Sequence, residues 1–259
     1  MDARRARACG RARYARLRAV LGGVLAMPTK RSSVLAGVAI SVGCLALIAL
    51  PVLIRTFAVQ PFSMPSGSME PSLLIGDYFF VNKSAYGYSH YSLPFSPRLF
   101  LGRILAARPQ RGDLAVFRLP RNDTVDYVKR VIGLPGDRIQ LKNGVLYING
   151  AAIRRDRMAN FEYAEDRRLL LAARWRETLP NGASYETLGQ DLATTMEFLV
   201  PPENYFVLGD DRDNSLDSRF PREFGYVPDE NLVGRVAVIF FSVGPSGLPR
   251  TERIGLTPQ

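Results

Sequence analysis

Hydrophobic and polar positions alternate in short segments over most of the chain after residue 57, a pattern that predicts a mainly β protein. Neighbouring residues of a strand point to opposite faces of a sheet, so alternating runs bounded by Gly, Pro or Asp are typical of strands. The expected strands are Tyr78–Val81, Leu114–Arg118, Thr124–Ile132, Arg138–Lys142, Val145–Ile148, Tyr205–Leu208 and Val233–Phe241. Asn143-Gly144 between two of them predicts a hairpin turn. We expect a folded antiparallel sheet or partly open barrel.

Two stretches depart from this pattern. Residues 162–176, EYAEDRRLLLAARWR, predict the one helix after residue 57. Residues 149–203 are more polar and less regular than the segments on either side, which indicates an inserted subdomain of β and irregular structure. The core would then comprise residues 57–148 and 204–259.

A different pattern occupies residues 34–54, VLAGVAISVGCLALIALPVLI, which carry no charge. As a helix they would extend about 31 Å, close to the roughly 30 Å hydrocarbon core of a bilayer. A buried globular helix is the alternative. Basic residues precede the segment and only Arg55 follows it closely, so the positive-inside rule places the N-terminus in the cytoplasm. No small-x-small site follows, so we expect an uncleaved anchor over 32–56 behind a basic tail, 1–31.

The location of the charges changes what the net charge of +10 means. Residues 1–31 hold nine Lys/Arg and one acid, and the remaining chain holds 25 basic and 23 acidic residues. A basic tail and a balanced globular part do not predict nucleic-acid binding. Both cysteines, Cys9 and Cys44, precede the exported part, and His90 is the only histidine. A cysteine nucleophile and the usual zinc sites are therefore excluded there, and we expect no metal or cofactor.

A tight serine cluster opens the exported part, in PSGSMEPSLLIGDYFFVNK at residues 65–83. With cysteine absent and a triad dependent on His90, the remaining activated nucleophile is a serine served by a lysine, which acts as a base only when neutral. An ordinary turn entering a strand is the alternative. No G-x-S-x-G elbow and no serine followed three residues later by lysine occurs, so the two groups must come from separate segments.

Three lysines lie in the exported part. Lys142 belongs to a hairpin and Lys83 ends a strand, so both are expected to be exposed. Lys129 lies within Tyr127-Val-Lys-Arg-Val-Ile132, on the strand face of Tyr127 and Val131, while Arg130 points the other way. Burial on that face would lower the lysine pKa. An edge strand with paired surface charges is the alternative.

A second polar concentration, GDDRDNSLDSR, covers residues 209–219. It fails as a calcium loop, because Leu216 stands where glycine is needed and Arg222 where glutamate is needed. The loop offers serine hydroxyls to orient a neighbour and Asp/Arg pairs to hold its own conformation. A solvated charged turn is the alternative.

These segments, in the order PSGSMEPSLLIGDYFFVNK, YVKRVIGLPGD (127–137) and GDDRDNSLDSR, closely resemble bacterial type I signal peptidases. The resemblance implies a membrane-anchored serine endopeptidase that removes signal peptides from exported preproteins after small residues of the Ala-x-Ala type. It makes Ser68 the nucleophile and Lys129 the general base. Ser66 and the Ser68 N–H would stabilise the oxyanion. Ser215 would hydrogen-bond the lysine, and Asp217 and Arg219 would form a supporting ion pair.

The resemblance also implies partners and a location. Small residues of the substrate would enter shallow pockets lined by the apolar neighbours Phe62, Met64, Met69, Leu73 and Tyr127. Exported preproteins and membrane lipid are the expected partners, at the inner membrane. From its own sequence, the stretch 93–101 is too hydrophobic for a freely soluble surface, so we expect it to rest at the membrane interface, with Phe95, Leu99 and Phe100 inserted and Arg98 and Arg103 at headgroups. Alternatively, the three apolar residues belong to the core.

Several other functions fit part of this pattern. A specialised peptidase could mature a single exported protein, and an anchored β module could bind exported proteins without cleaving them. A self-cleaving repressor shares a Ser/Lys dyad but needs a helix-turn-helix domain and a cytosolic location. Met27 begins a natural start, MPTKRSSV, so residues 1–26 are a possible misassigned leader.

Overall fold

The computed structural model describes residues 38–47, 49–50, 59–93, 96–97, 100–119, 121–165, 168–190 and 193–259. The chain forms two units, Met1–Val52 and Leu53–Gln259, and every strand of the described residues belongs to the second. Residues 38–47 and 49–50 are helical. Within the described ranges, no helix is both long and apolar enough to cross a membrane. The predicted span 34–54 lies partly outside those ranges.

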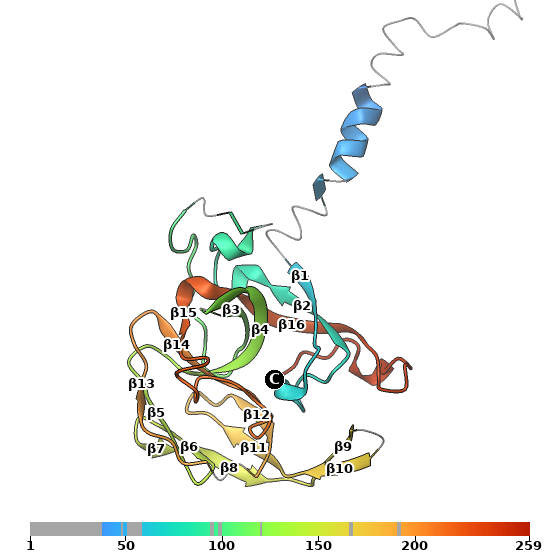
Figure 1. Cartoon of the computed structure of the whole chain (residues 1–259). Helices are drawn as coiled ribbons and strands as arrows, with labels where there is room; N and C mark the ends of the chain where they lie inside the picture. Colours follow the sequence, from blue (N-terminus) through green and yellow to red (C-terminus); the bar gives the residue numbers. More distant parts are fainter. Residues whose placement is uncertain are drawn as a thin grey trace, which may run out of the picture. The chain divides into compact units, whose positions relative to one another are not determined.

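The main sheet is antiparallel and has seven strands in the order β1-β2-β16-β3-β4-β14-β15 (Figure 1). Its strands are β1 (Val59–Ser63), β2 (Asp77–Asn82), β3 (Leu114–Leu119), β4 (Asn122–Gly133), β14 (Asn204–Leu208), β15 (Val227–Pro228) and β16 (Leu232–Ser242). β1 and β15 are its two edges, so the sheet does not close into a barrel. The prediction of a mainly antiparallel β fold is confirmed, and each predicted strand has its counterpart.

Smaller sheets are formed by the segment between β4 and β14. β5 (Arg138–Lys142), β6 (Val145–Ile148), β7 (Ala151–Ala152) and β13 (Phe198–Leu199) make a four-stranded sheet. β8 (Arg154–Arg157), β11 (Arg174–Thr178) and β12 (Ser184–Leu188) make a three-stranded one. This segment, residues 134–203, is called the smaller subdomain below; it contains regular strands, and its four-stranded sheet begins with β5, before residue 149. Asn143 and Gly144 both have positive φ, 48° and 76°, as the predicted hairpin turn requires.

The predicted helix over 162–176 is wrong. β9 (Phe161–Glu165) and β10 (Arg168–Ala172) form an antiparallel pair, and β11 begins at Arg174. The segment is rich in good helix formers, but β11 is held between β8 and β12 by pairing on both sides. Such tertiary pairing overrides a weak intrinsic preference.

The β4 strand is held by all three hydrophobic clusters of the second unit. Ile132 belongs to the cluster shared with β5 and β6, and Val131 to the cluster that contains Phe117. Val128 packs on the third cluster, which contains Met69 and Leu73. Packing on both faces fixes the position of the strand that carries Lys129 and Arg130.

Two basic side chains expected at the surface are buried. Lys83 is 3% exposed and its Nζ donates to the carbonyl of Ser92 (2.6 Å), because the chain turns inward directly after β2. Arg103 donates to four carbonyl groups within the fold, those of Tyr86, Gly87, Asp229 and Leu232. The expectation that Arg103 reaches lipid headgroups is therefore wrong.

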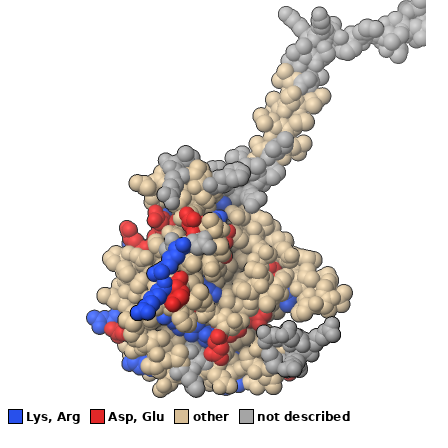
Figure 2. Space-filling model, viewed as in Figure 1, with Lys and Arg blue, Asp and Glu red and all other residues tan. Residues whose placement is uncertain are grey.

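Charged side chains of both signs lie among one another on the face of the globular unit seen in Figure 2. Lys and Arg lie close to Asp and Glu there, and uncharged surface covers much of the remainder. This distribution agrees with the near balance of charges after residue 31.

Candidate active site

The serine cluster forms a tight turn between β1 and β2. Ser68 lies in a single 3₁₀ turn, Gly67–Met69, and Ser66 is its N-cap residue. Met69 and Leu73 are fully buried in the core, and their packing fixes the position of this turn. Ser66 is exposed, and its Oγ lies 3.3 Å from Ser68 Oγ.

Lys129 reaches this turn from the middle of β4, where it is paired with Ala115 of β3. Its side chain is buried, and Nζ donates a hydrogen bond to Ser68 Oγ at 2.6 Å. Burial lowers the pKa of Lys129 from 10.5 to about 8. Asp217, Asp210 and Asp211 act against this shift, because a negative charge favours the ammonium, while Arg219 adds to it. The amine is thus poised to lose its proton at mildly alkaline pH.

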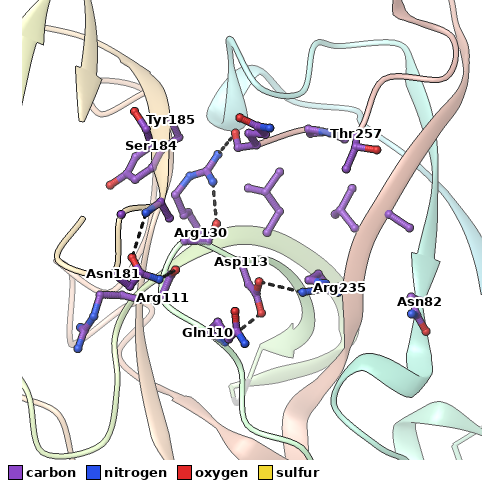
Figure 3. A pocket seen from close by; sticks show the side chains of 18 residues that line it. Asn82, Gln110, Arg111, Asp113, Arg130, Asn181, Ser184, Tyr185, Arg235 and Thr257 are labelled. Atoms are coloured by element: carbon purple, nitrogen blue, oxygen red, sulfur yellow. Dashed lines mark hydrogen bonds and ion pairs between the residues drawn. The ribbon is translucent and has the colours of Figure 1, made fainter. Parts of the chain in front are cut away.

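Arg130 points away from Lys129, as strand alternation predicts, into a polar cavity of about 710 Å³ (Figure 3). Its guanidinium forms a bidentate pair with Asp210 (2.7 and 2.6 Å). It also donates to the carbonyl of Gly112 and lies 4.1 Å from the centre of the Tyr185 ring. The two neighbouring basic residues therefore differ completely in role: one contacts serine and the other binds the 209–219 loop.

Asp217 organises that loop, residues 209–219. Its carboxylate accepts hydrogen bonds from Ser215 Oγ (2.8 Å), from the Gly209 N–H (3.0 Å) and from Arg219 Nε (2.8 Å). The predicted Asp217–Arg219 ion pair is present, with the Asp217 side chain fully buried. The loop also touches the serine turn directly, since the Asp211 N–H donates to the carbonyl of Ser68 (3.2 Å).

The apolar residues predicted around the site fall into two groups. Met64, Met69 and Leu73 lie in one buried cluster, with Phe62 packed against it. Tyr127 belongs to another, where its ring packs edge-on against Phe224. The first four therefore lie together beside the serine turn, whereas Tyr127 lies on β4, two residues before Lys129.

Sequence reasoning missed two contacts of the site. The Arg130–Asp210 pair joins β4 to the 209–219 loop, and Gly209 lets that loop approach the serine turn. A Cβ on Gly209 would lie 2.1 Å from Ser215 Oγ and 2.7 Å from the Ser68 carbonyl oxygen. An arginine next to the lysine and a glycine at the head of an acidic loop were visible signals, but neither says where its partner lies.

Comparison with known proteins gives consistent matches. Residues 36–241 match the family described as signal peptidase, peptidase S26. Signal peptidase I of Rickettsia canadensis is 42% identical over 208 residues, which is 76% of this chain and 77% of the relative. Signal peptidase I of Rickettsia akari is 42% identical over 211 residues, 77% of each chain. A crystal structure of a signal peptidase I from Enterococcus faecalis V583 is 29% identical and covers 50% of this chain and 97% of its own, with a TM-score of 0.30.

Proposed function

The chain belongs to the signal peptidase family, peptidase S26, and from this premise we propose that Ser68 and Lys129 perform its reaction, the removal of signal peptides from preproteins. The observation that carries the proposal is the contact of 2.6 Å between Lys129 Nζ and Ser68 Oγ. A lysine buried to this extent beside a hydroxyl is partly neutral near pH 8 and can take the proton of the serine.

The proposed reaction begins when Ser68 Oγ attacks the carbonyl carbon of the scissile peptide bond and its proton passes to neutral Lys129 Nζ. The tetrahedral intermediate then breaks its C–N bond, and the lysine ammonium returns the proton to the leaving amine. An acyl ester on Ser68 remains. Water then gives a proton to Lys129 Nζ while its oxygen attacks the ester carbon. The bond from that carbon to Ser68 Oγ breaks, the lysine ammonium returns the proton to Ser68 Oγ, and the new carboxyl group of the product leaves.

Ser66 and the backbone N–H of Ser68 are the proposed donors to the oxyanion. The exposure of Ser66 and its 3.3 Å distance from the nucleophile oxygen support this role. Such donors act most strongly when they are already oriented before charge develops. The 3₁₀ turn at Gly67–Met69, fixed by buried Met69, provides that orientation.

The loop around Asp217 supports the base in this proposal. After burial, the negative charge of Asp217 has the largest influence on the pKa of Lys129, and it favours the ammonium. Ser215 donates to Asp217 and is proposed to hydrogen-bond the lysine amine, while Arg219 balances the carboxylate. The loop would keep the amine directed at Ser68.

Specificity for small residues at the −1 and −3 positions is proposed to arise from the apolar surroundings of the serine turn. Phe62 remains partly accessible, while Met64, Met69 and Leu73 form the packed layer beneath it. A packed floor leaves depth for a methyl group and excludes larger side chains. Tyr127 would bound this region from β4.

A membrane location is part of the proposal: residues 34–54 anchor the chain once, with the N-terminus in the cytoplasm and the second unit outside. Exposed apolar side chains in the loop 101–105 support lipid contact by the second unit. Leu101, Ile104 and Leu105 are exposed, at 94%, 52% and 79%. Phe95, Arg98 and Leu99 of the originally predicted contact lie outside the described residues, and Phe100 is half-buried.

The proposal is tested with the full chain in detergent and a preprotein substrate, comparing wild type with Ser68→Ala and Lys129→Ala. Both variants should fold and both should lose cleavage, because nucleophile and base act as a unit. His90→Ala is the control and should cleave normally. Cleavage by Lys129→Ala at the wild-type rate would contradict the dyad, and binding without cleavage by wild type would favour a non-catalytic module.

A further inference from the structure

The smaller subdomain contacts the active-site loop at a fully buried ion pair. The carboxylate of Glu177 in β11 accepts hydrogen bonds from both terminal nitrogens of Arg212. Nη1 donates to Oε1 at 3.0 Å, and Nη2 donates to Oε2. Tyr185 of β12 donates its hydroxyl to the same carboxylate at 3.0 Å. Neither Glu177 nor Arg212 exposes any of its side chain. A bidentate pair of this kind permits a single relative orientation of its two groups.

Arg212 transmits this orientation into the loop. Its Nε donates to the Gly209 carbonyl (3.2 Å), and its own carbonyl accepts from Arg219 Nη2 (2.7 Å). Arg219 is the partner of Asp217, the residue that binds Ser215. Arg212 therefore connects the hairpin β11–β12 with both ends of the loop.

Backbone hydrogen bonds also join the β11–β12 hairpin to the 209–219 loop beside Ser68. The Leu188 N–H of β12 donates to the Asp210 carbonyl (2.8 Å), and the Arg212 N–H donates to the Leu188 carbonyl (2.9 Å). Between these two lies Asp211, whose N–H donates to the Ser68 carbonyl. The residue bonded to Ser68 is thus flanked on each side by a contact with the hairpin.

The same hairpin also reaches the residue after the lysine. The Tyr185 ring packs against the Arg130 guanidinium (Figure 3). Arg130 in turn holds Asp210. Tyr185 therefore contacts both Arg130, the residue after Lys129, and Glu177, the partner of Arg212.

We propose that the β11–β12 hairpin positions the active site and that Glu177 is its positioning residue, holding the 209–219 loop against Ser68 and Lys129 without contacting substrate. This inference rests on the proposed roles of Ser68 and Lys129. Removing the carboxylate charge that Arg212 and Arg155 share would let the loop shift. A displacement of about 1 Å at reacting groups can lower the rate about 100-fold.

The test compares kcat and KM for cleavage of one preprotein by the full chain in detergent. Glu177→Gln should lower kcat about 10- to 100-fold, and Tyr185→Phe, which removes one hydrogen bond, should lower it several-fold. KM should stay within about twofold in both, because no substrate contact is lost. The control is Asp137→Asn, which weakens a largely buried ion pair with Arg111 that does not involve the β11–β12 hairpin, and it should leave kcat unchanged.

Thermal melting of each variant separates positioning from stability. A folded Glu177→Gln with wild-type kcat overturns the proposal, as does an equal loss of kcat in Asp137→Asn. If Glu177→Gln does not fold, Tyr185→Phe decides, and a wild-type kcat in that variant overturns the proposal. Failure of wild type to cleave at all would instead contradict the proposed function.

Discussion

At the scale of single residues, the central quantity is the pKa of Lys129. Its decrease from 10.5 to about 8 corresponds to roughly 3 kcal/mol that burial imposes on the charged amine. The packing of β4 on both faces keeps Lys129 buried despite this unfavourable free energy. A lysine in a solvated turn, such as Lys142, has no comparable burial.

We expect kcat/KM to rise with pH through about 8. Below that value Lys129 is protonated and cannot accept the Ser68 proton, and above it the neutral amine predominates. A pH profile measured with one preprotein checks this. Lys129→Arg should be inactive at every pH, because a guanidinium keeps its proton. Activity that falls between neutral and mildly alkaline pH would point to another base.

Ser66 provides a second prediction at this scale. Loss of one oxyanion donor typically lowers the rate about 10²- to 10³-fold. Ser66→Ala should therefore lower kcat by about that factor with little change in KM, whereas Ser66→Thr keeps a hydroxyl and should retain part of the activity. Steady-state kinetics of the two variants decide the matter. Equal kcat for Ser66→Ala and wild type would exclude a donor at this position.

At the scale of elements, the close approach of the 209–219 loop to the serine turn depends on Gly209. An alanine Cβ there would lie 2.7 Å from the Ser68 carbonyl oxygen, a backbone atom that cannot move without moving the nucleophile. Gly209→Ala should therefore lower cleavage at least about 100-fold. Gly244→Ala is the control, since its nearest neighbour is 3.6 Å away. Cleavage rates and melting temperatures test both. Normal cleavage by Gly209→Ala would show that the loop tolerates displacement.

At the scale of the whole molecule, the division into two units predicts that catalysis and anchoring separate. A variant lacking residues 1–56 should cleave a preprotein in detergent, because all strands and the candidate site lie in the second unit. With Ser68→Ala added, it should be inactive. Loss of the fold on truncation, seen by circular dichroism, would contradict the separation.

The same truncated variant tests lipid contact. It should float with phospholipid vesicles, and Leu101→Ser with Ile104→Ser should weaken flotation, since both side chains are exposed and apolar. Leu248→Ser, at another exposed leucine, is the control. Failure of the truncated protein to bind vesicles would remove the loop from the proposal.

The strands and the family were determined by the sequence itself. Alternation along β2, β5 and β6 reports which face of each strand is buried, and this is local information. The three motifs in order identified the family, and they singled out Ser68 and Lys129 without any knowledge of distance. The hairpin turn at Asn143-Gly144 is equally local, because its residue types fit the required backbone angles.

Tertiary structure alone decided which polar groups are buried and what they contact. Arg103 was expected at the surface because its burial is produced by Leu232, 129 residues away. Lys83 contacts Ser92, nine residues away, through a turn that strand alternation does not predict. The segment 162–176 has helical composition, yet β11 is a strand because β8 and β12 pair with it. Glu177 lies 35 residues from Arg212 and belongs to none of the motifs, and only folding brings the two charges together. Local pattern sets the faces of each element, whereas contacts between distant elements set burial and therefore pKa and geometry at the site.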